Sequence, residues 1–430
     1  MKSSVWVFIA TTIAIEALKT PTHIIKFKES VNGTAAAQSV ILNQHRTYVL
    51  ENHQKVSSKS RKDLSEDEMM IWADSLGKQL SLESITVDKD FLAVAGVFGD
   101  ANFVKYLHTK HDIEYVEPNQ VYQTTVVLPR DEQPKQSLVK SVAANWGLAR
   151  ITHRQRRSYD EYFFDEKAGT DVHVYVLDSG INTHHRDFEN RASLLTNFIY
   201  DEEEHDLNGH VVKGTHVAGT IAGKTYGIAK NATVHSVKVL DQEGMGNTLT
   251  IIKGIKEVMK VAEPGKSLIN LSISGSKSRV LNEIIDKAVM EYKIPVFVSA
   301  GNNGGMDACF LSPSSNTNVF TVGASDMEDH ITSYSNIGNC VQIYAPGHRI
   351  TSTWIGQDDA TKIVDGTSMS NPHVTGIAAA LMTNHHFETP GELYEALIRM
   401  ATKDVLLFSN TKHTTTTNNL LAYHDLGQNV

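Results

Sequence analysis

Apolar and polar positions divide the chain into a short N-terminal pattern and a longer C-terminal one. In the first, residues 22–28 and 91–98 have the apolar content of strands, and residues 64–82 have helical spacing. Residues 102–110 suggest a further helix, and residues 113–124 a final extended segment. The pattern predicts a small domain of mixed helices and strands over residues 22–125.

The longer pattern begins near Trp146, after a segment rich in Pro, Ser and charged residues that indicates an exposed linker at 126–144. From there short apolar strands alternate with helical spacing, which predicts a parallel sheet covered by helices on both faces, an α/β fold. The candidate strands are residues 172–178, 232–240, 267–273, 294–300 and 318–324. We therefore expect a second, larger domain over residues 145–430.

The N-terminus has the features of a secretory signal peptide. Lys2 precedes an apolar run over residues 5–15, and Ala17 follows as a small residue. We expect residues 1–17 to be removed and the protein to enter the secretory pathway, with an extracellular, vacuolar or cell-surface destination. The alternative is a buried first strand or helix.

Composition narrows the classes of function. A net charge of −9 argues against a nucleic-acid partner, because such proteins usually carry a basic surface. The 41% hydrophobic content suits an ordinary globular protein, and we expect a monomer with no membrane span. The 20 histidines include no His-Glu-x-x-His pattern and there is no paired cysteine spacing, so we expect no metal site and no cofactor.

Three polar residues follow predicted strands or begin a helix. Asp178 ends an apolar strand before Ser-Gly, Asn302 follows another strand, and Ser368 begins a helix rich in small residues. In open α/β sheets catalytic groups gather at the carboxyl ends of strands. A serine nucleophile needs a base, and that base needs a carboxylate to orient it. The order Asp, His, Ser along the chain is the one found in subtilisin.

With these motifs, the chain resembles the subtilisin superfamily, in particular its proteinase K-like branch that includes yeast vacuolar proteinase B-type enzymes. The segments "WGLARITHR", "YGIAKNA" and "VKVLDQEGMGN" carry the resemblance further. It implies a three-layer subtilisin-like fold and a serine endopeptidase acting on polypeptides. Asp178 would orient the base, Ser368 would attack the scissile carbonyl, and Asn302 would donate to the oxyanion.

The resemblance also assigns the N-terminal domain. "AGVF" and "IEYVEPNQVYQT" resemble an inhibitor-type propeptide of α+β ferredoxin-like fold, which would act as chaperone and intramolecular inhibitor. We expect a self-inhibited zymogen with its processing site in the 126–144 linker. The strands that clasp substrate in the family would be formed here by Gly244, Met245, Gly246, Ser272, Ile273, Ser274 and Gly275. The family has Leu-Gly where this chain has Ile273-Ser274.

The histidine segment departs from the family pattern Asn-Gly-His-Gly-Thr-His. Here Val211, Val212 and Lys213 separate Asn208-Gly209-His210 from Gly214-Thr215-His216. Matching from the left makes His210 the general base. Matching from the right puts Lys213 at the catalytic position and His216 at the structural one. If the insertion after His210 displaces the base, the alternative is that the chain is a catalytically impaired homologue that binds peptides or partner proteins.

The resemblance has further implications. Related enzymes have a disulfide at the spacing of Cys309 and Cys340, so we expect this bond in an oxidising compartment. The proteinase K-like pattern has an aspartate for a structural calcium where this chain has Gln342, which argues against calcium here. Asn32 and Asn231 begin sequons for N-glycosylation.

Overall fold

A computed structural model describes residues 20–53, 66–87, 90–124, 143–156, 159–199, 213–408 and 417–425. The side chains of residues 53, 66–69 and 72 are also left out of the description. The predicted signal peptide, His210 and most of the predicted linker lie outside the described residues. The chain divides into two compact units, Met1–Asn119 and Gln120–Val430.

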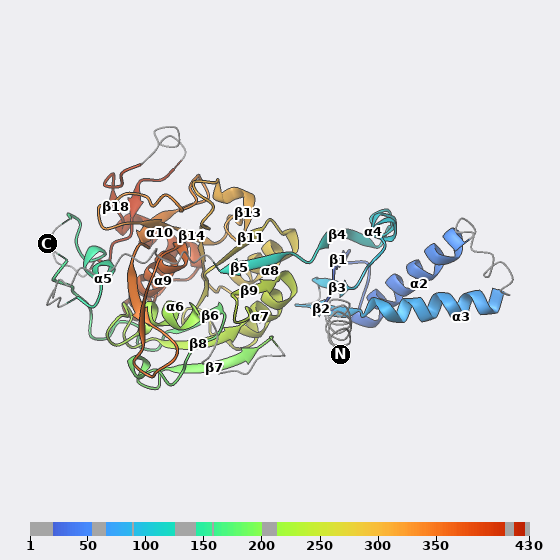
Figure 1. Cartoon of the computed structure of the whole chain (residues 1–430), viewed down its shortest axis with the longest axis horizontal. Helices are drawn as coiled ribbons and strands as arrows, with labels where there is room; N and C mark the ends of the chain where they lie inside the picture. The colour runs from blue at the N-terminus through green and yellow to red at the C-terminus, as the bar shows by residue number, and fades with distance from the viewer. Residues whose placement is uncertain are drawn as a thin grey trace, which may run out of the picture. The chain divides into compact units, whose positions relative to one another are not determined.

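The first unit is an antiparallel four-stranded sheet with helices (Figure 1). Its strands are β1 (His23–Phe27), β2 (Glu83–Thr86), β3 (Leu92–Gly96) and β4 (Ile113–Pro118), in the order β2-β3-β1-β4. Its helices are α2 (Thr34–His53), α3 (Glu66–Gly77), the 3-10 turn η1 (Lys78–Leu80) and α4 (Ala101–Leu107). Ile25, Val94 and Phe103 belong to its buried core. The mixed helix and strand content expected here is confirmed, although the sequence pattern had not indicated α2 or β2.

The extended segment predicted over residues 113–124 is two strands, because β4 ends at Pro118 and β5 (Val121–Thr124) belongs to the second unit. Pro118 has no N–H to continue a ladder. The Asn119 backbone N–H donates to the Thr22 carbonyl at 2.8 Å, and its side chain donates to the Pro21 carbonyl at 2.9 Å. These bonds tie residue 119 to the first unit.

The second unit contains a nine-stranded sheet of order β18-β19-β15-β14-β12-β10-β6-β8-β7. Its strands are β6 (His173–Asp178), β7 (Ala192–Asn197), β8 (Thr233–Lys238), β10 (Ser267–Leu271), β12 (Val296–Ser299), β14 (Phe320–Ser325), β15 (Ile343–Pro346), β18 (Thr402–Lys403) and β19 (Leu420–Leu421). Neighbours from β7 to β19 pair in parallel, and only β18 is antiparallel. The predicted α/β class with a parallel sheet is confirmed.

Helices cover both faces of this sheet (Figure 1). The helices described in this unit are α5 (Trp146–Arg150), η2 (Arg186–Phe188), α6 (Lys213–Ala222), α7 (Thr248–Val261), α8 (Arg279–Met290), η3 (Ala308–Phe310), α9 (Thr367–Asn384) and α10 (Pro390–Met400). On one face α6 and α9 pack over Val174 and Leu268. On the other face of the sheet, Gly254 of α7 packs against Leu177 of β6, where a Cβ on the glycine would lie 3.2 Å from the leucine Cδ2 atom.

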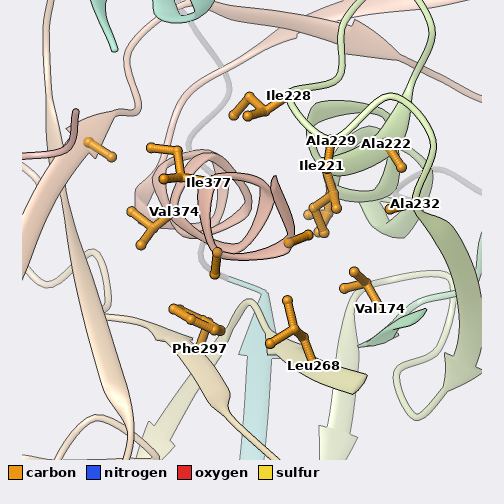
Figure 2. Packing of buried hydrophobic residues seen from close by; sticks show 14 of the residues in the cluster. Val174, Ile221, Ala222, Ile228, Ala229, Ala232, Leu268, Phe297, Val374 and Ile377 are labelled. Atoms are coloured by element: carbon orange, nitrogen blue, oxygen red, sulfur yellow. The ribbon is translucent and has the colours of Figure 1, made fainter. Parts of the chain in front are cut away.

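The central helix α9 is buried over most of its length. Figure 2 shows its Val374 and Ile377 facing Phe297 and Ile228. Small residues allow α9 to pack this closely, because a Cβ on Gly376 would lie only 2.9 Å from the Ile228 side chain. The packing fixes the N-terminus of α9 at the carboxyl ends of the strands.

Two smaller sheets complete the unit. One has the order β13-β11-β5-β9, with β9 (Met245–Asn247), β11 (Ile273–Ser276) and β13 (Leu311–Ser312), and the other pairs β16 (Ile350–Thr353) with β17 (Thr361–Val364). None of the helices in the described part of the chain is long and apolar enough to cross a membrane.

Candidate active site

Asp178 is the last residue of β6, and the turn after it fixes its carboxylate. Oδ1 accepts the Ser179 backbone N–H at 2.8 Å and the Ser179 hydroxyl at 3.1 Å. The next residue, Gly180, has a φ of +106°, a value that favours glycine. The side chain of Asp178 is 1% exposed, so its second oxygen, Oδ2, points into a buried site.

Ser368 is the second residue of α9, directly after Gly366 and Thr367. The first N–H groups of a helix have no partner within it, and the helix dipole favours negative charge there. The Ser368 hydroxyl is fully buried and donates to the Ser272 carbonyl at 2.9 Å. The Ser272 hydroxyl lies 3.3 Å from the Ser368 carbonyl oxygen, although its shorter hydrogen bond is to Asn270 Oδ1 at 2.9 Å. These contacts hold Ser368 next to the residue that follows β10.

Lys213 begins α6 and joins these two residues. Its ammonium nitrogen, Nζ, lies 3.0 Å from Asp178 Oδ2 and 3.2 Å from Ser368 Oγ, and donates to the Ser272 carbonyl at 2.5 Å. The side chain is fully buried. Gly214, the next residue, allows α6 to lie close to Gly180, because a Cβ on Gly214 would lie 2.2 Å from the Gly180 carbonyl oxygen.

The three oxygens around Lys213 Nζ fit both of its protonation states. A charged lysine has three N–H donors and no lone pair, so it cannot accept the proton of Ser368, whose hydroxyl donates to the Ser272 carbonyl. A neutral lysine donates to Asp178 and Ser272, and its lone pair can accept the proton of Ser368. Loss of one proton from Lys213 therefore changes this residue from a hydrogen-bond donor to Ser368 into a base for Ser368.

Burial and charge act in opposite directions on this proton. Burial is the larger effect and lowers the pKa of Lys213 below its ordinary value, because the ammonium loses its hydration. The Asp178 carboxylate and its hydrogen bond to the lysine oppose that shift and raise the pKa. The neutral form is thus more accessible than in an exposed lysine.

Asn302 lies beside the helix start and has a fixed amide orientation. Its Oδ1 accepts the Thr367 backbone N–H at 3.0 Å and the Thr367 hydroxyl at 2.8 Å. Because Oδ1 takes both donors, Nδ2 must occupy the other side of the amide. Asn302 is held next to the N–H groups that begin α9.

The two segments expected to clasp a substrate are β9 and β11, and β5 lies between them. Tyr122 pairs with Gly246 on one side and with Gly275 on the other, both antiparallel. The Tyr122 side chain is fully buried, and its hydroxyl donates to the Ser276 carbonyl at 3.1 Å. Residues of this same chain therefore form the middle strand.

The remaining predicted residues have mixed outcomes. His210 lies outside the described residues, so its role as base stays a prediction. His216, on α6, is fully buried, and its Nε2 donates to the Ile350 carbonyl at 2.9 Å. Burial lowers the pKa of His216 to about 4. Cys309 and Cys340 form the expected disulfide, with their Cα atoms 5.4 Å apart. Gln342 accepts the Thr321 backbone N–H through Oε1 at 2.6 Å.

Sequence reasoning missed Thr367, and it missed the role of the Ser272 carbonyl, although Ser272 itself was expected in a substrate-binding strand. Thr367 holds Asn302 through two donors, and its place before Ser368 could have indicated this role. The Ser272 carbonyl receives both Lys213 and Ser368. A backbone acceptor of this kind leaves no signal in the sequence.

The chain is similar in sequence and fold to known proteins. A family model described as the subtilase family matches residues 169–422. A subtilase-type proteinase of Schizosaccharomyces pombe is 36% identical, over 92% of this chain and 81% of its own length. Cerevisin of Saccharomyces cerevisiae is 37% identical to this chain. The match covers 81% of this chain and about half (55%) of the length of cerevisin.

A solved structure is also similar. It is the crystal structure of a cold adapted subtilisin-like serine proteinase, with a TM-score of 0.60 and 36% sequence identity. The match covers 66% of this chain and 98% of the solved one.

Proposed function

This chain is a subtilisin-like serine endopeptidase of the subtilase family, and we propose that it is made as a self-inhibited zymogen in which Ser368 attacks peptide bonds. The observation that supports this proposal is the contact of Ser368 Oγ with Lys213 Nζ, which in turn contacts Asp178 Oδ2. A nucleophile, a base and an orienting carboxylate stand in sequence, as an activated serine requires.

In the proposed mechanism neutral Lys213 is the general base. It takes the proton of Ser368 as Oγ attacks the scissile carbonyl, and Asp178 stabilises the ammonium that forms. The same ammonium then returns the proton to the leaving amine, and water hydrolyses the acyl-enzyme. His210 remains the alternative base, and the experiment below separates the two.

The oxyanion of the tetrahedral intermediate would be bound at the start of α9. Asn302 would donate from Nδ2, and Ser368 would donate from its backbone N–H at the positive end of the helix. Their fixed orientation means that little reorganisation accompanies the reaction.

Self-inhibition is supported by the position of β5. An extended substrate would bind as a strand between β9 and β11, through main-chain hydrogen bonds. The chain's own residues Val121–Thr124 take that place. We propose that this segment is the end of the inhibitory propeptide and that cleavage follows it within residues 126–144.

The disulfide of Cys309 and Cys340 supports a route through the secretory pathway, since such bonds persist in oxidising compartments. Asn32 and Asn231 are exposed, as glycosylation there would require. We propose an extracellular or vacuolar destination.

A fluorophosphonate probe tests the function, because it labels only an activated serine. We expect labelling of Ser368 in the purified protein, casein hydrolysis, and a processed form shorter than the full chain, all lost in Ser368→Ala. Lys213→Met should abolish labelling, whereas His210→Ala should preserve it if lysine is the base. The reverse result would assign the base to His210. Absence of label in every variant would contradict the enzymatic function.

A further inference from the structure

Lys213 differs from a histidine base in one chemical respect. A primary amine forms a stable amide when it is acylated, whereas an acylated imidazole is readily hydrolysed. The amine nitrogen of Lys213 lies 3.2 Å from Ser368 Oγ, the atom that would carry the acyl group. The carbonyl carbon of an acyl-enzyme is bonded directly to Oγ, so it forms within reach of this nitrogen.

We propose that Lys213 is itself an acylation site, which receives the acyl group of a peptide or ester from Ser368 and keeps it as an amide. The inference rests on the proposed function, because Ser368 must first form an acyl-enzyme. It assigns to Lys213 a covalent modification that limits the number of turnovers of the enzyme.

The transfer balances without any other reactant. The neutral amine attacks the ester carbonyl of acyl-Ser368, a C–N bond forms, and the C–O bond to Oγ breaks. The proton that the amine loses goes to Oγ, which lies at hydrogen-bond distance. The products are an amide on Lys213 and a free Ser368 hydroxyl.

The geometry favours transfer over hydrolysis. The amine is held at the acyl group, and groups held in this way reach effective concentrations on the order of 10⁵ M or more. The lysine is 0% exposed and is bound by Asp178 and Ser272, so it cannot swing out to solvent. Burial lowers the pKa of Lys213 and increases the fraction of amine that can attack. Once formed, the amide removes the base, and the site becomes inactive.

The experiment uses para-nitrophenyl acetate with the purified full chain, at several pH values from neutral to alkaline. The modified protein is treated with hydroxylamine, which removes an acetyl ester from serine but not an acetyl amide from lysine. Peptide mapping by mass spectrometry then locates the remaining acetyl group. We expect hydroxylamine-resistant acetyl on Lys213, increasing with pH, and a matching loss of fluorophosphonate labelling.

Two variants and one internal control define the result. Ser368→Ala should remove the Lys213 acetylation, because the transfer requires acyl-Ser368, whereas direct attack by the reagent would not need the serine. Lys213→Arg keeps the positive charge without a nucleophilic amine, and it should show no hydroxylamine-resistant acetyl. Lys238 is a matched control in the same protein: it is 3% exposed and donates to the Ser179 carbonyl at 2.8 Å. It should stay unmodified.

The outcomes separate the two proposals. Fluorophosphonate labelling of Ser368 without any amide on Lys213 would overturn the transfer and leave the proposed function intact. Equal acetylation of Lys213 in Ser368→Ala would also overturn the transfer, since the route would bypass the serine. Failure of Ser368 to react with either probe would overturn both.

Discussion

Tyr122 packs directly onto the backbone of Gly275, so closely that a Cβ on Gly275 would lie 2.6 Å from Cδ1 of the tyrosine ring. The strand between β9 and β11 is therefore held by a buried aromatic side chain as well as by its main-chain bonds. The Tyr122 contact therefore contributes to the stability of β5 between β9 and β11.

Tyr122→Ala should loosen β5. Loss of a fully buried aromatic side chain costs about 2–3 kcal/mol, so opening of the strand should become roughly 30- to 150-fold more frequent. Hydrogen exchange of residues 121–124, measured in a Ser368→Ala background that keeps the chain uncut, reports this opening. Val121→Ala is the matched control, because Val121 is 58% exposed on the same strand. Equal protection in both variants would contradict the anchoring role of Tyr122.

Deleting Val211–Lys213 should increase peptidase activity. The deletion leaves His210 directly before Gly214 and restores the spacing Asn-Gly-His-Gly-Thr-His. An imidazole has an unperturbed pKa near 6.5 and is largely neutral at pH 7, so no buried ammonium needs to lose a proton. We expect at least a 100-fold gain in kcat/KM at neutral pH on a chromogenic peptide. Lys213→His should give a gain in the same direction without shortening the chain. Loss of activity in both variants would show that lysine is required at this position.

Activity of the unaltered chain should rise with pH. Only neutral Lys213 can accept the Ser368 proton, so the rate increases as pH passes upward through the pKa of Lys213 and is level above it. That pKa lies below the ordinary lysine value because burial disfavours the ammonium. In Lys213→His the rising limb should move toward the histidine value of about 6.5. The profile of kcat/KM against pH measures both, and an unchanged profile in the variant would exclude Lys213 as the titrating group.

Asn302→Ala should lower kcat by about 10²- to 10³-fold with little change in KM, because the lost hydrogen bond forms mainly in the transition state. Thr367→Val should cause a smaller loss, since it removes only the hydroxyl that orients the amide. Thr367→Ser keeps that hydroxyl and is the control. Steady-state kinetics on one peptide substrate compare the three. A fall in Thr367→Ser as large as in Thr367→Val would show that the methyl group, not the hydroxyl, matters.

The double variant Cys309→Ser, Cys340→Ser should reduce the free energy of unfolding by about 3–4 kcal/mol, the effect expected for a loop of this length. Urea denaturation measures the change. Neither sulfur contacts Asp178, Lys213 or Ser368 in the described structure, so fluorophosphonate labelling of the folded variant should stay near that of the parent. A large loss of labelling with unchanged stability would contradict a purely structural role.

The sequence predicted where Asp178, Asn302 and Ser368 lie, because each marks the end of an apolar strand or the start of a helix. Their catalytic roles stay predictions. The base could not be chosen in the same way. Three additional residues can be accommodated before a helix or within it, and spacing does not distinguish these cases. In the structure Gly214 of α6 lies against the Gly180 carbonyl, and this backbone contact between distant segments positions the neighbouring Lys213. The sequence pattern also could not show that residues 113–124 form two strands. That division arises because β4 belongs to the first unit and β5 to the second.

The proposed role of β5 as the end of the inhibitory propeptide has a consequence for how the cleft could be freed. A separate inhibitor leaves its enzyme on dilution, but β5 belongs to the same polypeptide as β9 and β11. Its effective concentration is set by the covalent connection and is independent of how much protein is present. Dilution alone would leave the cleft filled, and only cutting the chain beyond Thr124 would turn a permanent neighbour into one that can diffuse away.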